Sequence, residues 1–354
     1  MKILKGFILA WFVFSFLSCE NEEGTDSPKF PLAFEHNIDE QKLRAAYDKA
    51  EQITGLKSLL VSRDGVLISE QYFTEMGAED VYDVRSVTKS VISALVGIAI
   101  NEGFIDSLDQ ALLDFIGPLG YSLEGEKALI TIRDLLTMSA GFEWNEFESG
   151  YNYRDWATSP DQIEYCINGV LENSPGDVFS YSSEEAHLLS VILTVATGMS
   201  THDFALEYLF EPLGMDIMDF SWAYFPQGYF NGGAALSLKP RDMIKLGNLY
   251  LNNGMYNGNQ IIPSEWIHES TSFHITTNLQ GYLPDYGYLW WINKNGTNNY
   301  YFANGYAGQL IGVYPDLNLV VVSTSNWQLS TNEAGQQWYN IMTLIQNDIL
   351  NSIN

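Results

Sequence analysis

The feature that most constrains the fold of this chain is a long apolar segment that directly follows a polar turn. Nearly every residue from 91 to 100 is apolar, so a helix over this segment has no polar face and must be buried. The preceding turn contains Ser86 and Lys89, which are three residues apart and therefore share one face of a helix. We expect a helix that opens at Ser86 and ends near Gly103. A lysine at the head of a buried helix requires a specific role, since lysine is rarely buried without one.

This turn contains the groups that nucleophilic catalysis by a serine requires. The Ser86 hydroxyl is a poor nucleophile by itself and needs a neighbouring base. The Lys89 amine can be that base if burial keeps it neutral, because desolvation disfavours the ammonium form. Backbone N–H groups at the helix start could stabilise a developing oxyanion. Because S-x-x-K also occurs by chance, a capped surface helix with a solvated lysine is the alternative interpretation.

The amino terminus has the pattern of a targeting segment and not of a folded element. An apolar stretch over residues 7–17 follows two lysines and is too short to span a bilayer stably. It leads into Phe16-Leu17-Ser18-Cys19, which resembles the bacterial lipobox, so residues 1–19 are expected to be a lipoprotein signal with Cys19 lipid-modified. An ordinary secretory signal is the alternative. Residues 20–33 are polar and indicate a flexible tether. We therefore expect a lipid-anchored protein of the bacterial cell envelope, in contact with the membrane only through this anchor.

Charge and cysteine content exclude several classes of function. A net charge of −27 argues against nucleic-acid partners and against a basic membrane-binding face. Cys166 is the only cysteine apart from Cys19, so no intramolecular disulfide is expected after processing, and Cys166 is expected to pack in the core. The chain has no H-E-x-x-H motif and no clustered Cys/His spacing, and neither a metal nor a cofactor is expected. His187 lies in an apolar segment and is expected to be a core residue.

The order of the predicted elements is strands, then helices, then strands and a helix. This order indicates an antiparallel sheet whose two halves flank a helical segment. A β-hairpin is predicted over 56–73, and further strands over 286–292, 299–302, 309–314 and 319–325. Besides the helix at Ser86, helices are predicted over 38–53, 106–115, 131–138, 160–171, 186–197, 202–209, 240–252 and 335–349.

The predicted elements also indicate how the folded part is organised. We expect one folded unit over residues 34–350, with a sheet subdomain over 34–80 and 220–350 and a helical subdomain over 81–219. Residues 142–159 are rich in aromatic residues without a clear period. They are expected to form a long loop that could wall a pocket.

Three short motifs occur in order along the chain, each beside a buried element. They are Ser86-Val87-Thr88-Lys89, Tyr181-Ser182-Ser183 and Asn304-Gly305-Tyr306-Ala307-Gly308-Gln309. Together they resemble the motifs of the serine β-lactamase and penicillin-binding protein superfamily, which are S-x-x-K, S/Y-x-N and K-T-G. With a tyrosine in its first position, the second motif resembles that of the class C-like branch. This branch includes esterases, D-aminopeptidases and 6-aminohexanoate-dimer hydrolases. The resemblance covers roughly residues 35 to 350. It implies an α/β (α+β) fold of the β-lactamase/D,D-peptidase type, an antiparallel sheet flanked by helices with a helical insertion.

The resemblance also implies roles for individual residues. Ser86 would form an acyl-enzyme, with Lys89 and Tyr181 as general bases, and the pKa of Tyr181 would have to fall below 10 for that role. The backbone N–H groups of Ser86 and Tyr306 would form the oxyanion hole. Substrate binding would involve Ser183, Asn304, Gly305 and Gln309.

Two departures from the motifs bear on the substrate. Ser183 stands where asparagine is usual, and the third motif contains Asn304 but not the usual lysine, which helps hold the carboxylate of β-lactam substrates. We therefore expect a serine hydrolase that cleaves an ester or amide bond in a small molecule or short peptide. The alternatives are a peptidoglycan D,D-peptidase or weak β-lactamase, and a non-catalytic binding or sensing protein that retains the fold.

Overall fold

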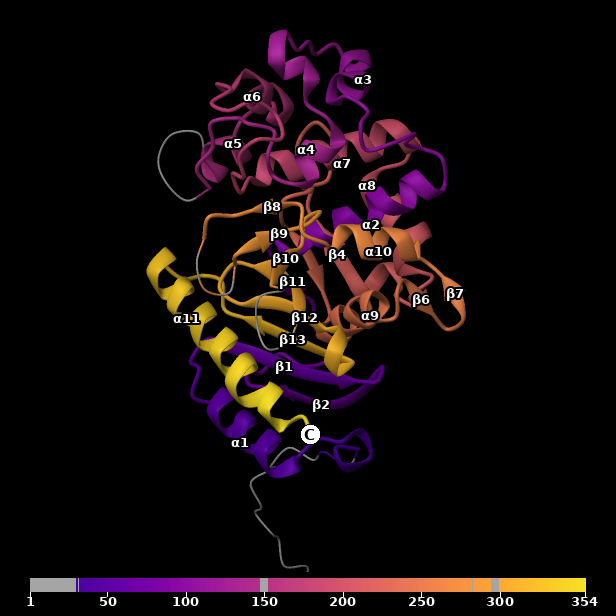
Figure 1. The fold of residues 1–354 in the computed structure, drawn as a ribbon. Coiled ribbons are helices and arrows are strands. Elements are labelled where there is room, and N and C mark those ends of the chain that lie inside the picture. Colours follow the sequence, from indigo (N-terminus) through magenta and orange to yellow (C-terminus); the bar gives the residue numbers. More distant parts are fainter. Residues whose placement is uncertain (1–29, 31, 147–151, 280, 282, 294–298) are drawn as a thin grey trace, which may run out of the picture.

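The computed structural model describes residues 30, 32–146, 152–279, 281, 283–293 and 299–354, and its central element is a twisted antiparallel sheet (Figure 1). Among these residues the sheet has eight strands in the order β2-β1-β13-β12-β11-β10-β9-β8. The strands are β1 (Leu56–Arg63), β2 (Val66–Tyr72), β8 (Ile275–Thr276), β9 (Asp285–Tyr286), β10 (Trp291–Asn293), β11 (Tyr300–Gly305), β12 (Gln309–Tyr314) and β13 (Leu319–Ser325). The predicted hairpin β1–β2 is confirmed, and β1 pairs with β13, so both ends of the chain contribute to one sheet.

Within the described part of the chain, five short strands lie outside this sheet. They are β3 (Tyr82–Asp83), β4 (Phe220–Trp222), β5 (Leu236–Leu238), β6 (Met255–Tyr256) and β7 (Asn259–Gln260). The first three form a small sheet in the order β3-β5-β4, and β6 pairs with β7. Because β3 ends just before Ser86, this small sheet holds the segment that leads into the predicted nucleophile.

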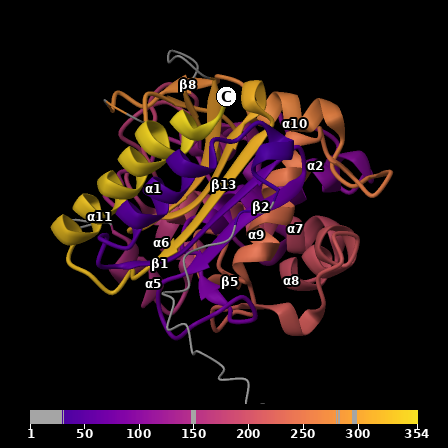
Figure 2. The same ribbon diagram turned by 90° about the horizontal axis from the view of Figure 1, so that it is seen from below.

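Helices cover both faces of the central sheet and gather at one end of it. Figure 2 shows α1 and α11 together on one face, and α2 and α9 on the other. The helices α3 to α8 lie at the end drawn at the top of Figure 1. Their bounds are α1 (Glu40–Ala50), α2 (Val87–Asn101), α3 (Leu112–Ile116), α4 (Ile132–Leu136), α5 (Tyr153–Ala157), α6 (Gln162–Asn168), α7 (Ser183–Thr197), α8 (Thr201–Ala205), α9 (Pro240–Leu251), α10 (Ser264–Ser270) and α11 (Thr331–Leu344).

The predicted buried helix after Ser86 is α2, and every residue from Val87 to Ala99 is buried. It contacts α7, α10 and the strands β11 and β12, so neighbours surround it on all sides. An apolar helix without a polar face is stable only in such an enclosed position. The prediction for this segment is therefore confirmed.

Three predictions differ from the observed structure. The segment 142–159, expected to be a long loop, contains the helix α5, which the Asn152 side chain caps by accepting a hydrogen bond from Asp155 N and which buries Trp156. The helix predicted over 106–115 begins only at Leu112, because the Gln110 side chain accepts a hydrogen bond from Asp106 N and Ala111 pairs with Thr131 as an isolated bridge. The strand predicted over 286–292 is split into β9 and β10 by a tight turn in which Leu289 has a φ of 60°. None of these differences follows from local periodicity, since each depends on a specific turn or cap.

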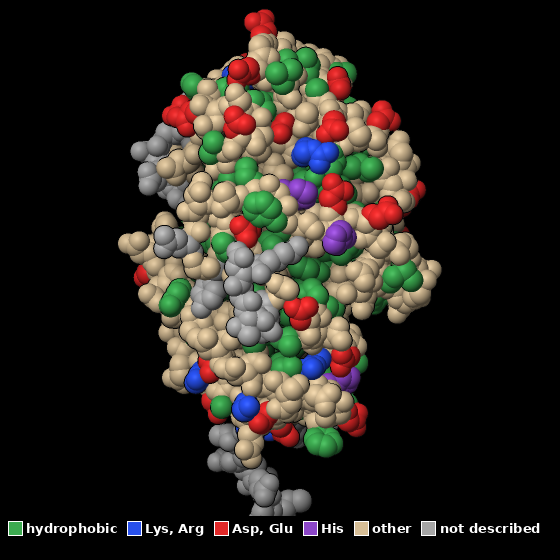
Figure 3. Space-filling model, in the orientation of Figure 1, with side chains coloured by type: hydrophobic (Ala, Val, Ile, Leu, Met, Phe, Trp, Pro, Cys, Tyr) green, Lys and Arg blue, Asp and Glu red, His purple; other side chains and the backbone are tan. Residues whose placement is uncertain are grey.

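The surface of the molecule is predominantly acidic. On the face in Figure 3, acidic side chains are scattered and basic ones are few, in keeping with the net charge of −27. In the described part of the chain, no single helix has the length and apolarity needed to cross a membrane. The segments Ser183–Thr197 and Thr201–Phe210 reach that length and apolarity only as a pair bent by 80°.

Candidate active site

The segment just before α2 makes a sharp turn that presents Ser86 to a cavity. Arg85 has a φ of 52°, and its backbone N–H donates to Asp83 Oδ1 at 2.9 Å. The Thr88 hydroxyl donates to the Arg85 carbonyl at 2.6 Å, which holds the first turn of the helix against this bend. Ser86 is the residue directly before α2, and its side chain is partly exposed in the cavity.

Lys89 lies one turn further on, and its side chain is only 1% exposed. Its Nζ is 3.1 Å from Ser86 Oγ, 2.9 Å from Ser183 Oγ and 2.8 Å from the Gly233 carbonyl oxygen. Burial lowers the pKa of Lys89 to about 8, with a smaller opposing effect from the negative charge of Glu146. The structure therefore brings the predicted nucleophile and base together. It contradicts the alternative of a solvated lysine on a surface helix.

The Gly233 carbonyl reaches Lys89 because two glycines let their loop pack directly against α7. A Cβ atom on Gly233 would lie 2.7 Å from both Cβ and the carbonyl oxygen of Ser183. The loop is fixed by Asn231, whose Oδ1 accepts hydrogen bonds from Gly233 N at 2.9 Å and Ala234 N at 3.1 Å. The sequence analysis missed this contact. The only local signal was the Asn231-Gly232-Gly233 turn, which does not indicate what its carbonyl contacts.

Tyr181 lies beside this pair, but its pKa shifts in the direction opposite to the prediction. Burial raises the pKa of Tyr181 and Glu146 adds to the rise, while an interaction with the Ser86 hydroxyl and the charge of Arg85 act in the other direction. Lys89 Nζ is 4.7 Å from the centroid of the Tyr181 ring, so the ammonium faces the ring. The predicted fall of this pKa is wrong, because desolvation of the phenol outweighs the nearby positive charges. Tyr181 is therefore protonated at neutral pH.

The predicted oxyanion-hole residues, Ser86 and Tyr306, both line the cavity. Strand β11 ends at Gly305, where an added Cβ would lie 2.3 Å from the Val84 carbonyl oxygen. The absence of a side chain at Gly305 thus lets the end of β11 run against the segment that precedes Ser86. This close approach brings Tyr306 and Ser86 to the same site. The role of their backbone N–H groups as an oxyanion hole stays a prediction.

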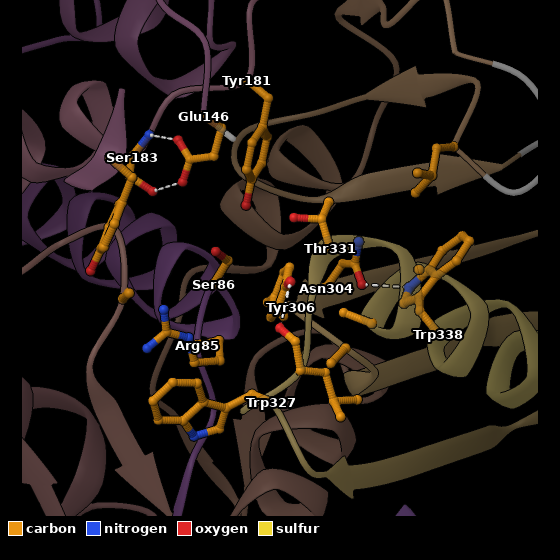
Figure 4. Close-up of a pocket in the computed structure, with 18 of the residues that line it drawn as sticks. Arg85, Ser86, Glu146, Tyr181, Ser183, Asn304, Tyr306, Trp327, Thr331 and Trp338 are labelled. Carbon is orange, nitrogen blue, oxygen red and sulfur yellow. Dashed lines mark hydrogen bonds between the residues drawn. The ribbon is translucent and has the colours of Figure 1, made fainter. Parts of the chain in front are cut away.

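The cavity has a volume of about 720 Å³ and is bounded mostly by apolar and aromatic side chains. Figure 4 shows Ser86 between the pair Glu146–Ser183 on one side and Asn304, Tyr306 and Trp338 on the other. The described residues that line it are Arg85, Ser86, Glu146, Tyr153, Tyr181, Ser183, Ala234, Leu279, Leu283, Trp291, Asn304, Gly305, Tyr306, Ala307, Trp327, Gln328, Leu329, Thr331, Ala334, Gly335 and Trp338.

Charged side chains at this cavity already have partners. The Arg85 guanidinium is 3.2 Å from Asp83 Oδ2 and lies 4.5 Å from the centroid of the Trp327 ring. The Glu146 carboxylate accepts hydrogen bonds from Trp144 Nε1, Ser183 N and Ser183 Oγ. Glu146 belongs to the aromatic segment 142–159, but that segment holds several acidic residues and the sequence does not distinguish among them.

The four predicted substrate-binding residues do not all face the cavity. Asn304, Gly305 and Ser183 line it, and Asn304 Oδ1 accepts a hydrogen bond from Trp338 Nε1 at 2.8 Å. The prediction for Gln309 is wrong. Its side chain is fully buried, and it exchanges hydrogen bonds with the backbone of Ser325 on β13 at 2.9 Å. Gln309 therefore links the start of β12 to the end of β13 and does not contact the cavity.

Residues outside the three motifs are mostly structural. Cys166 and His187 are buried, as expected, and His187 Nδ1 is 3.2 Å from the Phe230 carbonyl oxygen. Within the aromatic segment 142–159, Tyr153 lines the cavity, while Trp144 and Trp156 pack in a small buried cluster with Phe225. Across the residues with described positions, no group of three or more His, Cys, Asp or Glu side chains could hold a metal ion.

The comparison with protein families decides the assignment. The Beta-lactamase family model matches residues 41–344 of this chain. The chain belongs to the Beta-lactamase family, and it is a serine hydrolase of that family. The 6-aminohexanoate-dimer hydrolase of Paenarthrobacter ureafaciens is 22% identical to it over 76% of this chain and 72% of the relative.

Solved structures support the same fold. The chain superposes on EstCE1, a hydrolase with promiscuous acyltransferase activity, with a TM-score of 0.71 and 16% identity over 86% of this chain and 99% of that one. It also matches the octameric penicillin-binding protein homologue of Pyrococcus abyssi, with a TM-score of 0.68 and 18% identity over 89% and 77% of the two chains. The predicted resemblance and fold are confirmed.

Proposed function

We propose that this Beta-lactamase family member cleaves an ester or amide bond through an acyl intermediate on Ser86, with Lys89 as the base. The observation that supports this most is the 3.1 Å contact between Lys89 Nζ and Ser86 Oγ, made by a lysine that is 1% exposed. A buried amine is neutral over more of the pH range than a solvated one, and only the neutral amine can accept a proton.

In the proposed reaction the neutral Lys89 takes the proton of the Ser86 hydroxyl as Oγ bonds to the substrate carbonyl carbon. The N–H groups of Ser86 and Tyr306 would stabilise the oxyanion, and loss of such a donor typically costs about 3–4 kcal/mol. The bond to the leaving group then breaks, and the proton on Lys89 passes to the leaving oxygen or nitrogen, with the Tyr181 hydroxyl as a hydrogen-bond donor. Water next attacks the acyl carbon and gives a proton to Lys89. The bond between the acyl carbon and Ser86 Oγ then breaks, Lys89 returns this proton to Oγ, and the acid is released.

The walls of the cavity support a substrate with apolar groups. Trp291, Trp327 and Trp338 lie along it together with several leucine and alanine side chains. Two of the three proteins named above are a 6-aminohexanoate-dimer hydrolase and a hydrolase with promiscuous acyltransferase activity. Both names are in keeping with carbonyl chemistry on small substrates, which this proposal extends to the present chain.

A fluorophosphonate probe tests the proposal, because it reacts covalently with an activated serine. We expect the probe to label Ser86 and the variant Ser86→Ala to remain unlabelled. No labelling of the folded wild-type protein would favour a binding or sensing protein that retains the fold.

A substrate panel tests the reaction type. It should contain p-nitrophenyl esters, short ω-amino-acid amides, D-aminoacyl peptides and nitrocefin. We expect turnover of esters or amides that depends on Ser86. Rapid turnover of nitrocefin, or of D-aminoacyl peptides alone, would replace this proposal with a β-lactamase or a D,D-peptidase.

We also propose that the protein is anchored to a bacterial membrane through a lipid on Cys19. The support is the sequence of the first 19 residues, which lie outside the part of the chain that the structure describes. The variant Cys19→Ser should be released from the membrane fraction, and retention of this variant on membranes would refute the anchor.

A further inference from the structure

A continuous chain of hydrogen bonds leads from the nucleophile to a carboxylate that no family motif contains. Ser86 Oγ contacts Lys89 Nζ at 3.1 Å, Lys89 Nζ contacts Ser183 Oγ at 2.9 Å, and the Ser183 hydroxyl donates to Glu146 Oε1. We infer that Glu146 is a positioning residue that orients Lys89 as a base by fixing the direction of the Ser183 hydrogen bond. This inference rests on the proposed function.

The direction of each hydrogen bond follows from the chemistry of the partners. A neutral lysine amine has two hydrogens and one lone pair, whereas a carbonyl or carboxylate oxygen can only accept. The Gly233 carbonyl, at 2.8 Å, therefore takes one amine hydrogen. Ser183 gives its own hydrogen to Glu146, so toward Lys89 it can only accept, and it takes the second amine hydrogen. The lone pair of Lys89 is left for Ser86.

Without Glu146 this direction would not be fixed. A serine hydroxyl rotates freely and can donate as well as accept. If Ser183 donated to Lys89, it would occupy the lone pair of the amine, and Lys89 could no longer take the proton of Ser86. Glu146 removes this competing arrangement because an ionised carboxylate has no hydrogen to offer. Figure 4 shows both carboxylate oxygens turned toward Ser183, on the side of the cavity next to Ser86.

Three donors hold the Glu146 carboxylate in place. The Ser183 backbone N–H donates at 3.0 Å and Trp144 Nε1 donates at 2.8 Å, both to Oε2, while the Ser183 hydroxyl donates to Oε1. Hydrogen bonds from several donors fix the orientation of the carboxylate. The Ser183 backbone N–H lies in the first turn of α7, so the start of this helix takes part in the contact.

Several other titratable groups lie around Lys89 and Glu146 and bear on the pH dependence. Arg85 and Tyr181 face Lys89 from the turn before α2 and from the segment before α7. Glu184 on α7 and Tyr153 on α5 are influenced by Glu146. Tyr181 and Tyr286 are influenced by Glu146 as well. Because Glu146→Asp keeps the negative charge that acts on all these groups, a change of the pH profile confined to Glu146→Gln reports on the loss of that charge.

The test compares the rate of fluorophosphonate labelling at Ser86 from pH 6 to 10 in the wild-type protein and in Glu146→Gln. The amide can donate to Ser183 and release its hydroxyl toward Lys89, so we expect the limiting rate at high pH to fall about tenfold or more. Loss of the negative charge also disfavours the ammonium form, so the midpoint of the profile should move to lower pH. A purely structural role would lower the rate without moving the midpoint.

Three further variants make the result decisive. Glu146→Asp keeps the carboxylate and should retain the wild-type midpoint. Ser183→Ala removes the acceptor and should lower the limiting rate even if Glu146→Gln fails to fold. Glu143→Gln removes an equal charge from the same segment at a residue that does not line the cavity, and should match the wild type. Circular dichroism and thermal unfolding check the fold of each variant.

The outcomes separate this inference from the proposed function. An unlabelled wild-type protein would refute the proposed function. Normal labelling of the wild type, with an unchanged rate and midpoint in Glu146→Gln and an unchanged rate in Ser183→Ala, would overturn the role of Glu146 alone. A fall in rate in Glu146→Gln without a shift of the midpoint would also overturn it.

Discussion

The pH dependence of Ser86 acylation is the sharpest consequence of this geometry. Burial lowers the pKa of Lys89 from its ordinary value of 10.5 to about 8. This difference corresponds to about 3 kcal/mol in favour of the neutral amine in the folded protein. With a pKa of about 8, roughly one-tenth of the molecules carry a neutral Lys89 at pH 7 and roughly nine-tenths at pH 9. The rate of acylation should therefore rise about tenfold between these pH values and then level off.

The assay is the second-order rate of fluorophosphonate labelling, measured at constant ionic strength from pH 6 to 10.5. A profile that still rises above pH 10 would refute the reasoning, because it would indicate a solvated lysine or a Tyr181 phenolate as the base. A flat profile would show that no group titrating in this range limits the reaction. Tyr181→Phe provides the control, since removal of a protonated tyrosine should lower the rate but leave the midpoint near 8.

Three other predictions concern stability, backbone approach and the cavity wall. Gly305→Ala places a Cβ 2.3 Å from the Val84 carbonyl oxygen, and we expect labelling to fall at least tenfold and the free energy of unfolding, measured in urea, to fall by about 1–3 kcal/mol. Lys89→Met removes the group whose pKa is lowered by folding. The free energy of unfolding of the wild type relative to this variant should rise by about 3 kcal/mol between pH 8 and 10.5, because in that window the unfolded chain binds the proton that the folded chain has lost. A constant difference would refute this linkage. Trp338→Ala removes an apolar part of the cavity wall and should raise KM for long-chain p-nitrophenyl esters more than for p-nitrophenyl acetate. An equal effect on both esters would contradict an apolar subsite at Trp338.

Local patterns predicted those parts of the fold that local interactions determine. The apolar segment over 91–100 required burial in any compact fold, and α2 is buried from Val87 to Ala99. The hairpin of β1 and β2 followed from alternation and a Gly turn, and it forms as predicted. The proximity of Ser86 and Lys89 followed from helical spacing alone.

The parts of the site that depend on long-range packing could not be predicted in this way. Gly233 is 144 residues from Lys89 along the chain, and their contact exists only because a glycine loop packs against α7. Gln309 follows a glycine and is the first residue of β12, a position equally consistent with a cavity wall and with its actual buried position against Ser325. The direction of the Tyr181 pKa shift depends on the balance between burial and nearby charges, which spacing in the sequence does not reveal.

The two departures from the family motifs change the electrostatics of the site in the same direction. The third motif lacks the lysine that would attract a substrate carboxylate, and the second motif has a serine that is bonded to the Glu146 carboxylate. Among the described residues that line the cavity, Arg85 is the only lysine or arginine, and its charge is already paired with Asp83. Lys89 is close to Ser86 and carries a positive charge below its pKa of about 8, but it lies beneath the nucleophile and contacts Ser86, Ser183 and the Gly233 carbonyl. We therefore expect this cavity to attract a substrate carboxylate less strongly than a site that carries the third-motif lysine. A lower KM for neutral p-nitrophenyl esters than for esters that carry a carboxylate would support this expectation, and the reverse order would contradict it.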